Sequence, residues 1–367
     1  MGNMILFTSS VLVWAGYAAA QASSGTFSVL SYNVAGLPEL LSSGNPATNT
    51  PLLAPKLAPY GIVNVQEDFN YHAALYAGDK HAYRTATSGG VPFGSGLNTL
   101  SNYPFIDLQR VTWSKCAVGS GDCLTPKGFT LLRARVDTGV MSTFTISTQM
   151  LDPSQLTSLL EMQTLLNSSG APAEGSSALV CPDNGAALSL TATRFNNENS
   201  AFLNSTGYPL SDHYPITTTF TYSLSTSRRL TDLAGGSGGT WFSDLPSLPS
   251  GTPTLTSITL SGANRFDYIS LTLSTGTTFK HGGTGGTPVT LTLSSGERIT
   301  SLRVDTGSYN SDTRVFYVGI GTSSGRTLGA GTQTSSTVTW TAPSGLGLKG
   351  IYGKSGDGVD LLGGIWA

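Results

Sequence analysis

The chain has 367 residues, which is long enough for two domains, and carries 19 Lys and Arg against 21 Asp and Glu. Only 11% of its residues are charged and the net charge is −2, so the basic surface of a DNA-binding protein is absent and that function is disfavoured. Its 45 glycines, with β-branched residues in short runs, are typical of a strand-rich secreted protein.

The first 22 residues are an expected signal peptide. Residues 4–17 are mostly apolar, and the small residues Ala20 and Ala22 fit cleavage after Ala22. This run is short for a membrane span of roughly 20 residues. No later stretch is longer and as apolar, so we expect a secreted, extracellular protein without a membrane span. Asn167 and Asn204 begin sequons and are candidate glycosylation sites.

Two apolar runs near the start end in polar residues. Residues 27–33 predict a strand that ends at Asn33, and residues 60–67 predict a strand that ends at Glu67. Further on, Asp212 directly precedes His213, which combines a carboxylate with the usual general base near neutral pH.

His72 and His81 follow Glu67 and are candidate neighbours of an active site. His72 is the better candidate because it follows Glu67 closely. For both, the alternative is an ordinary loop or surface histidine.

Asn33, Glu67 and the Asp212-His213 pair, in this order, resemble the endonuclease/exonuclease/phosphatase superfamily, which includes DNase I-like nucleases, sphingomyelinases and inositol phosphatases. The resemblance covers residues 26–222 and implies an α+β fold, a DNase I-like four-layer α/β sandwich. It implies that His213 is the general base and that Asp212 orients it or binds the metal. Glu67 would hold Mg²⁺ or a similar divalent cation, and Asn33 would support the metal or the phosphate. The three motifs should then converge at one end of the sandwich.

The resemblance is incomplete in the middle of the chain. The superfamily has a strand ending in Asn-x-His and a later one ending in Asp-x-Asn, but no His lies between His81 and His213. Asp152 and Asp183-Asn184 are candidate substitutes, although neither ends a convincing strand. Residues 151–182 predict a short helix followed by a loop. We infer that a central portion is missing through a deletion, alternative splicing or a faulty gene model, and whether the domain is active stays open.

Other features of this region fit the same interpretation. The Gly-rich run before residue 101 resembles the turn into the third strand of the superfamily's first sheet. Residues 127–136 alternate polar and apolar side chains and predict a half-buried strand. In a secreted protein Cys116 and Cys123 would pair across a loop. Cys181 would then lack a partner, in agreement with a missing segment.

Beyond a polar linker at residues 223–232 the chain changes character. Short β-rich runs follow one another at close spacing with Gly-rich turns between them, which predicts an antiparallel all-β domain at residues 233–367. These runs are residues 255–260, 267–273, 289–293, 299–304 and 313–318.

Gly-rich motifs in this second domain, taken in order, resemble the jacalin-related lectins, whose fold is a β-prism of three four-stranded sheets. The motifs are residues 235–236, 265–269, 281–286, 293–299 and 351–363. The resemblance implies a sugar pocket made by Gly236 and a Gly-x-x-x-Asp loop, in which Asp360 accepts sugar hydroxyls and backbone amides donate. The loop residues are Gly356, Asp357, Gly358, Val359 and Asp360.

Some alternatives remain open for this domain. The loop lacks the aromatic residue of many galactose-binding relatives, so the sugar is not identified. A prism kept as a spacer or interaction surface is the alternative to sugar binding. His281 belongs to a Gly-rich turn and is assigned a structural role.

Together these motifs predict a secreted, metal-dependent phosphodiesterase-like or phosphatase-like hydrolase that a lectin domain tethers to glycans. The low positive charge favours a lipid or small phosphoester substrate over DNA. The alternative is a carbohydrate-binding lectin with a degenerate, inactive hydrolase domain. The absence of a histidine between His81 and His213 favours that alternative for this chain.

Overall fold

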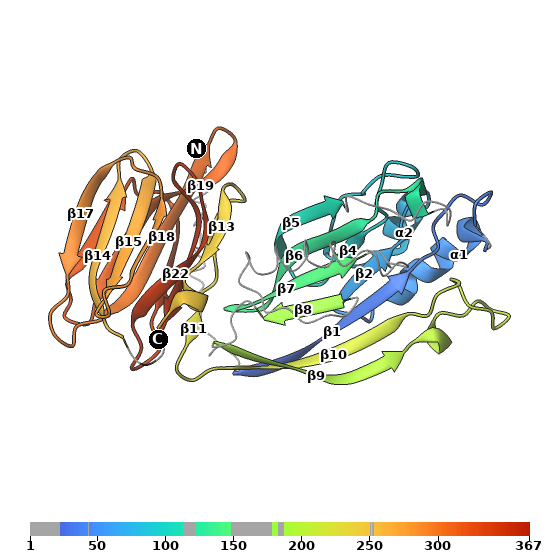
Figure 1. Ribbon diagram of the computed structural model, residues 1–367, viewed down its shortest axis with the longest axis horizontal. Coiled ribbons are helices and arrows are strands. Elements are labelled where there is room, and N and C mark those ends of the chain that lie inside the picture. Colours follow the sequence, from blue (N-terminus) through green and yellow to red (C-terminus); the bar gives the residue numbers. More distant parts are fainter. Residues whose placement is uncertain are drawn as a thin grey trace, which may run out of the picture.

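The computed structural model describes residues 23–42, 44–112, 122–147, 178–182, 187–249, 251 and 253–367. The predicted signal peptide, Cys116, Asp152, Asn167 and Asp183-Asn184 lie outside these ranges. Cys123 is disulfide-bonded, and its pairing with Cys116 stays a prediction. Two assemblies of strands lie next to each other along the long axis of the molecule (Figure 1).

The first assembly is built on a six-stranded sheet in the order β3-β4-β2-β1-β10-β9. Its strands are β1 (Ser24–Asn33), β2 (Ile62–Gln66), β3 (Tyr83–Arg84), β4 (Asn98–Ser101), β9 (Leu188–Asn197) and β10 (Ile216–Leu224). β1 is parallel to β2, with Asn33 opposite Gln66, and antiparallel to β10, with Ser31 opposite Ile216. The carboxyl ends of β1 and β2 therefore meet the start of β10 at one end of the sheet.

Helices α1 (Pro46–Leu53) and α2 (His72–Gly78) cover one face of this sheet. Alternate side chains of β1 point to the two faces, as the period of a strand requires. Leu30 and Tyr32 pack with the helices, whereas Phe27 and Val29 belong to a second core on the other face. In Figure 1 the helices lie at the end of the sheet that is remote from the second assembly.

A second, antiparallel sheet in the order β5-β6-β7-β8 packs on that other face. It comprises β5 (Phe105–Thr112), β6 (Gly128–Asp137), β7 (Val140–Ser147) and β8 (Ala178–Pro182). Two predictions are wrong here. Residues 178–182 form a strand rather than a loop, and residues 128–134 of β6 are all buried rather than half-buried. Arg133 is buried because the Asp107 carboxylate and the Trp241 ring take up its charge, and these partners are distant in the sequence.

The second assembly is a prism of three antiparallel sheets, and the all-β prediction for it is confirmed. The first sheet contains β11 (Arg229–Leu230), β12 (Ala234–Gly235), β13 (Thr240–Ser243), β22 (Leu348–Ser355) and β23 (Val359–Trp366). The second contains β14 (Leu255–Gly262), β15 (Phe266–Leu273), β16 (Thr278–Gly282) and β17 (Thr287–Thr292). The third contains β18 (Ile299–Tyr309), β19 (Asp312–Thr322), β20 (Thr327–Gly331) and β21 (Ser336–Thr341). One apolar core fills the space between the sheets, including Leu260, Ile269, Leu302, Val318 and Ile351.

The predicted linker is partly built into the prism. Within residues 223–232, β11 pairs with β23, placing Arg229 opposite Trp366 and Leu230 opposite Ile365. Leu230 is buried in a small cluster with Ala187 and Tyr352. The connection between the two domains is therefore a strand of the prism's first sheet along part of its length.

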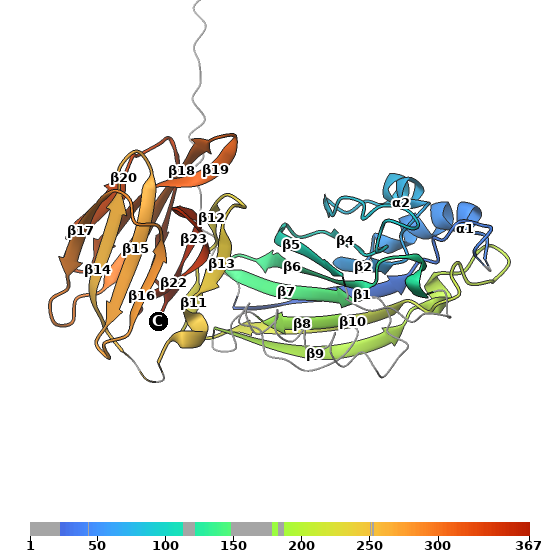
Figure 2. The ribbon, with the colours of Figure 1, turned by 45° about the horizontal axis from the view of Figure 1, so that its top comes forward.

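Side-chain contacts also join the two domains, which meet where β5, β6 and β7 approach β13 (Figure 2). Asp107 binds Arg133 of its own sheet and, at 3.1 Å, the Nζ atom of Lys354 in the prism. Arg135 donates to Asp232 at 2.8 Å, and the Arg133 guanidinium lies 4.2 Å from the centre of the Trp241 ring. The two domains thus share a polar interface, of which Asp107, Arg133 and Lys354 are the buried part.

The described part of the chain is mostly β, with three layers in the first domain: helices, a six-stranded sheet and a four-stranded sheet. The fourth layer of the predicted sandwich is not among the described residues, and the DNase I-like fold stays a prediction. Among the helices in the described ranges, none is long and apolar enough to cross a membrane.

Candidate functional site

The topology brings the segments that carry Asn33, Glu67 and His213 to one end of the six-stranded sheet. On one side of β1, Val34 N donates to Gln66 O at 2.9 Å and Gly36 N donates to Glu67 O at 3.0 Å. On its other side, Ser211 Oγ donates to Asn33 O at 2.7 Å. In Figure 1 β1 points away from the prism, so this end lies far from it.

Glu67 is the residue at this end that is best suited to bind a cation. Its side chain is half-buried, and its carboxylate has no hydrogen bond or ion pair with any residue that the structure describes. Its φ of 57° is unusual for a residue with a side chain and costs about 1 kcal/mol or more. The Oδ1 atom of Asn33 instead accepts from Ala35 N at 2.9 Å, so part of its capacity is used locally.

Asp212 and His213 are not hydrogen-bonded to each other. The distance from His213 Nε2 to Asp212 Oδ1 is 3.9 Å, and the side chains are 43% and 55% exposed. Burial, together with the charge of Asp212, raises the pKa of Tyr32 above its ordinary value. The Asp212 carboxylate thus lies close enough to Tyr32 to influence it, and it does not orient the imidazole of His213.

A buried polar network behind Glu67 was not predicted from the sequence. The Asp68 carboxylate is 2% exposed and accepts from His72 Nδ1 at 2.7 Å and from Asn98 Nδ2 at 2.8 Å. Asn98 Oδ1 in turn accepts from Arg110 at 2.7 Å. The sequence signal that could have revealed this network is the spacing of Asp68 and His72, which are four residues apart at the start of a helix. This spacing places the His72 ring beside the Asp68 carboxylate, and the contact supports the end of β2.

His81 is an ordinary loop histidine, as the alternative reading had it, but it is buried rather than on the surface. Its Nδ1 contacts Asp79 Oδ1 at 2.6 Å and its Nε2 contacts the Tyr60 carbonyl at 2.7 Å. Both ring nitrogens are used in holding the fold together, and none is directed at a substrate.

The fit of a divalent cation can be judged from these donors. No group of three or more His, Cys, Asp or Glu suited to a metal exists among the residues that the structure describes. Protein-bound Mg²⁺ often keeps several waters and one or two carboxylates. Glu67 could serve as such a single carboxylate ligand. The Oδ1 atom of Asn33 already accepts one hydrogen bond, so it has only one lone pair free for a metal.

The predicted sugar loop does meet the start of the prism domain. Residues 356–358 join β22 to β23, which begins with Val359 and Asp360, and Gly236 N donates to Asp360 O at 2.8 Å. At Gly239, φ is +71°, and a Cβ atom would overlap Oδ2 of Asp360. Gly356 and Asp357 are exposed, whereas Gly358, Val359 and Asp360 are buried. Segments from opposite ends of the domain sequence therefore form one loop cluster.

Asp360 has a partner that the sequence did not indicate. Its carboxylate forms an ion pair with Arg314 of β19, which also approaches Asp312 at 3.2 Å. Arg314 comes from a different sheet, so no local pattern around residues 356–360 could have revealed it. One oxygen of the carboxylate that was predicted to bind sugar, Oδ1, is thus paired with a guanidinium group.

His281 has the structural role that was assigned to it. Its Nε2 contacts Asp244 Oδ1 at 2.7 Å, and its ring stacks on Phe242 with centroids 3.8 Å apart. The other oxygen of Asp244 accepts from Ile351 N at 2.8 Å. This cluster ties the second sheet of the prism to the first.

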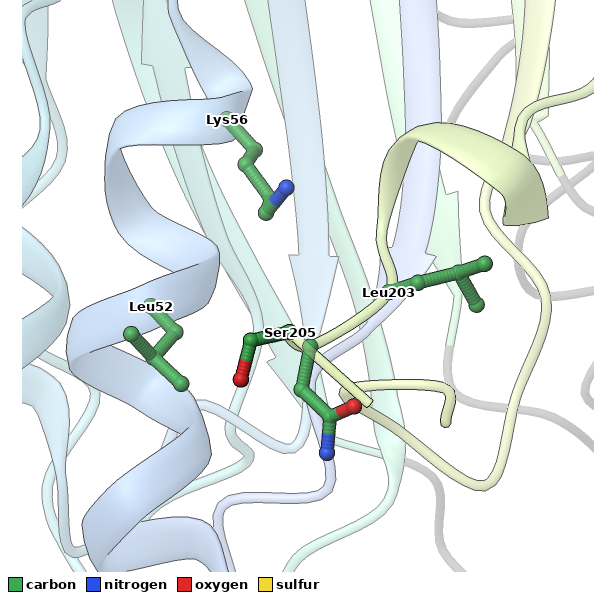
Figure 3. Close-up of a pocket in the computed structure, with 5 residues that line it drawn as sticks. Leu52, Lys56, Leu203 and Ser205 are labelled. Atoms are coloured by element: carbon green, nitrogen blue, oxygen red, sulfur yellow. The ribbon is translucent and has the colours of Figure 1, made fainter. Parts of the chain in front are cut away.

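Two cavities lie apart from the predicted catalytic, metal-binding and sugar-binding residues. One, of about 380 Å³, lies between α1 with its following turn and the 203–205 loop, and Lys56 points across it (Figure 3). It is lined in part by the sequon residue Asn204, whose Oδ1 accepts from Thr206 and Tyr208. The other, of about 310 Å³, lies between the domains and is lined by Arg135, Asp232 and Trp340 among others.

Comparison with known proteins finds relatives of two kinds. Residues 231–365 match the family model of the jacalin-like lectin domain. Among solved structures, a Malaysian banana lectin is 23% identical, with a TM-score of 0.33, and the match covers 38% of this chain and 96% of the banana lectin chain. A mannose-specific jacalin-related lectin from Morus nigra is 21% identical, with a TM-score of 0.34, and the match covers 39% of this chain and 96% of the Morus nigra chain.

Sphingomyelinases of Mycobacterium bovis and Mycobacterium tuberculosis are also similar to this chain. Each is 40% identical over 140 residues, which is 36% of this chain. The match spans 28% of the length of those relatives.

Proposed function

Residues 231–365 are a jacalin-like lectin domain, and from this premise we propose that the chain binds carbohydrate and thereby tethers a sphingomyelinase-related phosphoesterase domain to glycans. The lectin function rests on one observation above all. Two glycine-rich segments from opposite ends of the domain close around a buried carboxylate, at Gly236–Gly239 and at residues 356–360. A carboxylate accepts hydroxyl hydrogen bonds, and glycine lets a sugar approach the backbone amides.

A glycan array probed with the intact chain tests the lectin function. We expect binding to a restricted set of glycans, and competition by the corresponding free sugar. A chain that is folded by circular dichroism but binds no glycan on the array would contradict the proposal and favour the spacer alternative.

For the first domain we propose an incomplete member of the endonuclease/exonuclease/phosphatase superfamily, in which the three described layers are part of a DNase I-like sandwich. The similarity to sphingomyelinases and the convergence of Asn33, Glu67 and His213 support it. Glu67 would hold Mg²⁺, which when bound neutralises phosphate oxygens. His213 would take the proton of the attacking water, and Asn33 would contact the phosphate. A lipid or small phosphoester is the proposed substrate class.

An inactive hydrolase domain is the second candidate, and one observation favours it. His213 is exposed and has no hydrogen bond to Asp212, and the sequence has no histidine between His81 and His213 to complement it. Catalytic groups that act as a unit lose most of their effect when one is missing. We therefore expect little or no turnover from this chain.

An assay with Mg²⁺ on sphingomyelin, DNA and bis-p-nitrophenyl phosphate distinguishes the two candidates. His213→Gln keeps a hydrogen-bonding side chain but cannot serve as the base, and Arg194→Ala, an exposed change on β9, is the matched control. Robust turnover that is lost in His213→Gln and kept in Arg194→Ala would show that the domain is an active enzyme.

We also propose that the chain is secreted and glycosylated. Residues 1–22 carry the predicted signal, and the Asn204 sequon lies in a surface loop with Ser205 and Thr206 exposed. Expression in a eukaryotic secretory host should release the protein into the medium. Treatment with an N-glycosidase should lower its mass in wild type, and less so in Asn204→Gln.

A further inference from the structure

The segment that joins β12 to β13 forms one side of the predicted sugar site. Its residues 235–239, which we call the glycine loop, read Gly-Gly-Ser-Gly-Gly. Gly236 N donates to the Asp360 carbonyl, and a Cβ atom at Gly239 would overlap Asp360 Oδ2. Because Arg314 pairs with Oδ1 of this carboxylate, Oδ2 is the oxygen left for a sugar hydroxyl. The position of the glycine loop therefore decides how a sugar can approach that oxygen.

One side chain holds the middle of the glycine loop. The Nζ atom of Lys354 in β22 donates to the Ser237 carbonyl at 2.8 Å. In the part of the chain that the structure describes, this is the only hydrogen bond of residues 237–239. Glycine has the widest choice of backbone conformations, so a loop with four glycines in five residues keeps a single conformation only where a contact imposes it. The conformation of the glycine loop therefore depends on Lys354.

The other two sheets of the prism hold their corresponding loops from the same position. In each sheet one residue lies opposite the second residue of the strand that follows the loop. These pairs are Lys354 opposite Trp241, Ser261 opposite Pro288 and Asp305 opposite Thr337. Ser261 Oγ donates to the Gly285 carbonyl at 2.8 Å. Asp305 Oδ2 accepts from Thr334 N at 3.1 Å. The contact that Lys354 makes is thus one of three equivalent contacts in the fold.

The residue in the first sheet differs because its charge is met from outside the prism. Ser261 is neutral, and Asp305 accepts two bonds of 2.8 Å from Arg303 of its own strand. Lys354 instead pairs with Asp107 of the first domain, at 3.1 Å from Nζ to Oδ1. Their side chains are 9% and 7% exposed, and a buried ammonium group without a carboxylate is costly. The place of Lys354 beside the glycine loop therefore depends on Asp107.

The first domain also covers the strand neighbour of Lys354. The Arg133 guanidinium of β6 lies 4.2 Å from the centre of the Trp241 ring and pairs with the other oxygen of Asp107. Figure 2 shows β5 and β6 approaching β13 at this junction. Two residues of each domain thus form one cluster next to the glycine loop.

We propose that Asp107 is a positioning residue for the sugar site of the prism. It fixes Lys354, which holds the glycine loop beside Asp360, so that contact with the first domain raises the affinity of the prism for glycans. This inference rests on the proposed lectin function. The glycan affinity is then a property of the two domains together and not of the prism alone.

Titration calorimetry of the full-length chain tests this, at a temperature where circular dichroism shows every variant to be folded. The probes are methyl α-D-mannopyranoside, methyl α-D-glucopyranoside and methyl α-D-galactopyranoside. If none of the three binds, the variants are compared on the glycan array instead. Asp107→Asn should weaken binding about three- to tenfold, because only a fraction of the loops then has the competent conformation. The number of sites per chain should stay unchanged.

A second variant separates the loop contact from the stability of the junction. Lys354→Met removes the bond to Ser237 but leaves the ion pair between Asp107 and Arg133, so it carries the test if Asp107→Asn does not fold. It should weaken binding as Asp107→Asn does. If Asp107 acts through Lys354, the double variant should bind no more weakly than the weaker single variant.

The matched control is Asp232→Asn, at the more exposed interdomain pair with Arg135. It loosens the junction without touching the loop contact and should change the affinity less than about twofold. An equal loss in Asp232→Asn, wild-type affinity in Lys354→Met, or additive losses in the double variant would overturn the inference and leave the lectin function intact. Fewer sites at unchanged affinity would indicate a loss of folded protein and would also overturn it. If the intact chain binds neither the three sugars nor any glycan on the array, the lectin function itself fails.

Discussion

Replacing Asp107 by Asn should weaken the junction between the two domains. The Asp107 carboxylate binds Arg133 and Lys354, and the exposed fractions of the three side chains are 7%, 1% and 9%. Asp107 has a φ of 59°, a conformation that Asn adopts readily, so the substitution changes the charge and leaves the backbone almost unperturbed.

The cost follows from burial. Removing one member of a buried ion pair leaves an uncompensated charge and typically costs about 3–5 kcal/mol. After the change, the Lys354 ammonium keeps its bond to the Ser237 carbonyl at 2.8 Å but no carboxylate. The second interdomain pair differs because Arg135 is 45% exposed and Asp232 is 21% exposed. For such a pair Asp232→Asn should cost only about 0.2–1 kcal/mol.

Differential scanning calorimetry of the intact chain measures this contrast. For Asp107→Asn we expect the transition of the affected domain to fall by roughly 6–20 °C, since 1 kcal/mol shifts Tm by about 2–4 °C in a domain of this size. Asp232→Asn should lower it by at most about 4 °C. Equal shifts for the two variants would refute the argument that burial makes the Asp107 junction the stronger one.

Two further predictions concern stability within each domain. The ion pair with Arg326 holds the pKa of Glu297 below its ordinary value of 4.5, so its stabilisation is present above that pH and is lost as the pH falls through the lower folded-state pKa. Glu297→Gln should therefore lower Tm at pH 7 and by less at pH 2, and an equal effect at both pH values in circular dichroism melts would contradict this. Phe202 is fully buried between two tyrosine rings, and Phe202→Ala should cost about 3–5 kcal/mol in urea unfolding. Leu40→Ala, at a side chain that is 97% exposed, should stay within about 0.5 kcal/mol of wild type.

The sequence was informative wherever the signal is local. The apolar runs that end at Asn33 and Glu67 became β1 and β2, because strand period and strand ends are encoded by neighbouring residues. The meeting of Gly236 with Asp360 was also expected, on the resemblance of ordered motifs to a lectin family. The sequence therefore predicted which segments carry the candidate sites.

Contacts that arise only from the docking of sheets, and that no family resemblance implied, were not predictable. Nothing near Asp360 indicates that Arg314 reaches it from another sheet, and nothing near Arg133 indicates that its charge is met by Asp107. Each depends on the docking of sheets rather than on sequence period.

The pairing of β11 with β23 makes the connection between the two domains short and ordered. β10 ends at Leu224 and β11 begins at Arg229, and Ser225 fastens the intervening residues by accepting from Ser227 N and Arg228 N. A flexible linker would let one domain search a volume around the other, at an effective concentration set by its length. Here the two domains share one orientation instead. If the prism binds a glycan, the candidate site at the carboxyl end of β1 is then held at a fixed distance and orientation from that glycan. Only substrates at that distance and orientation from the glycan would contact the site.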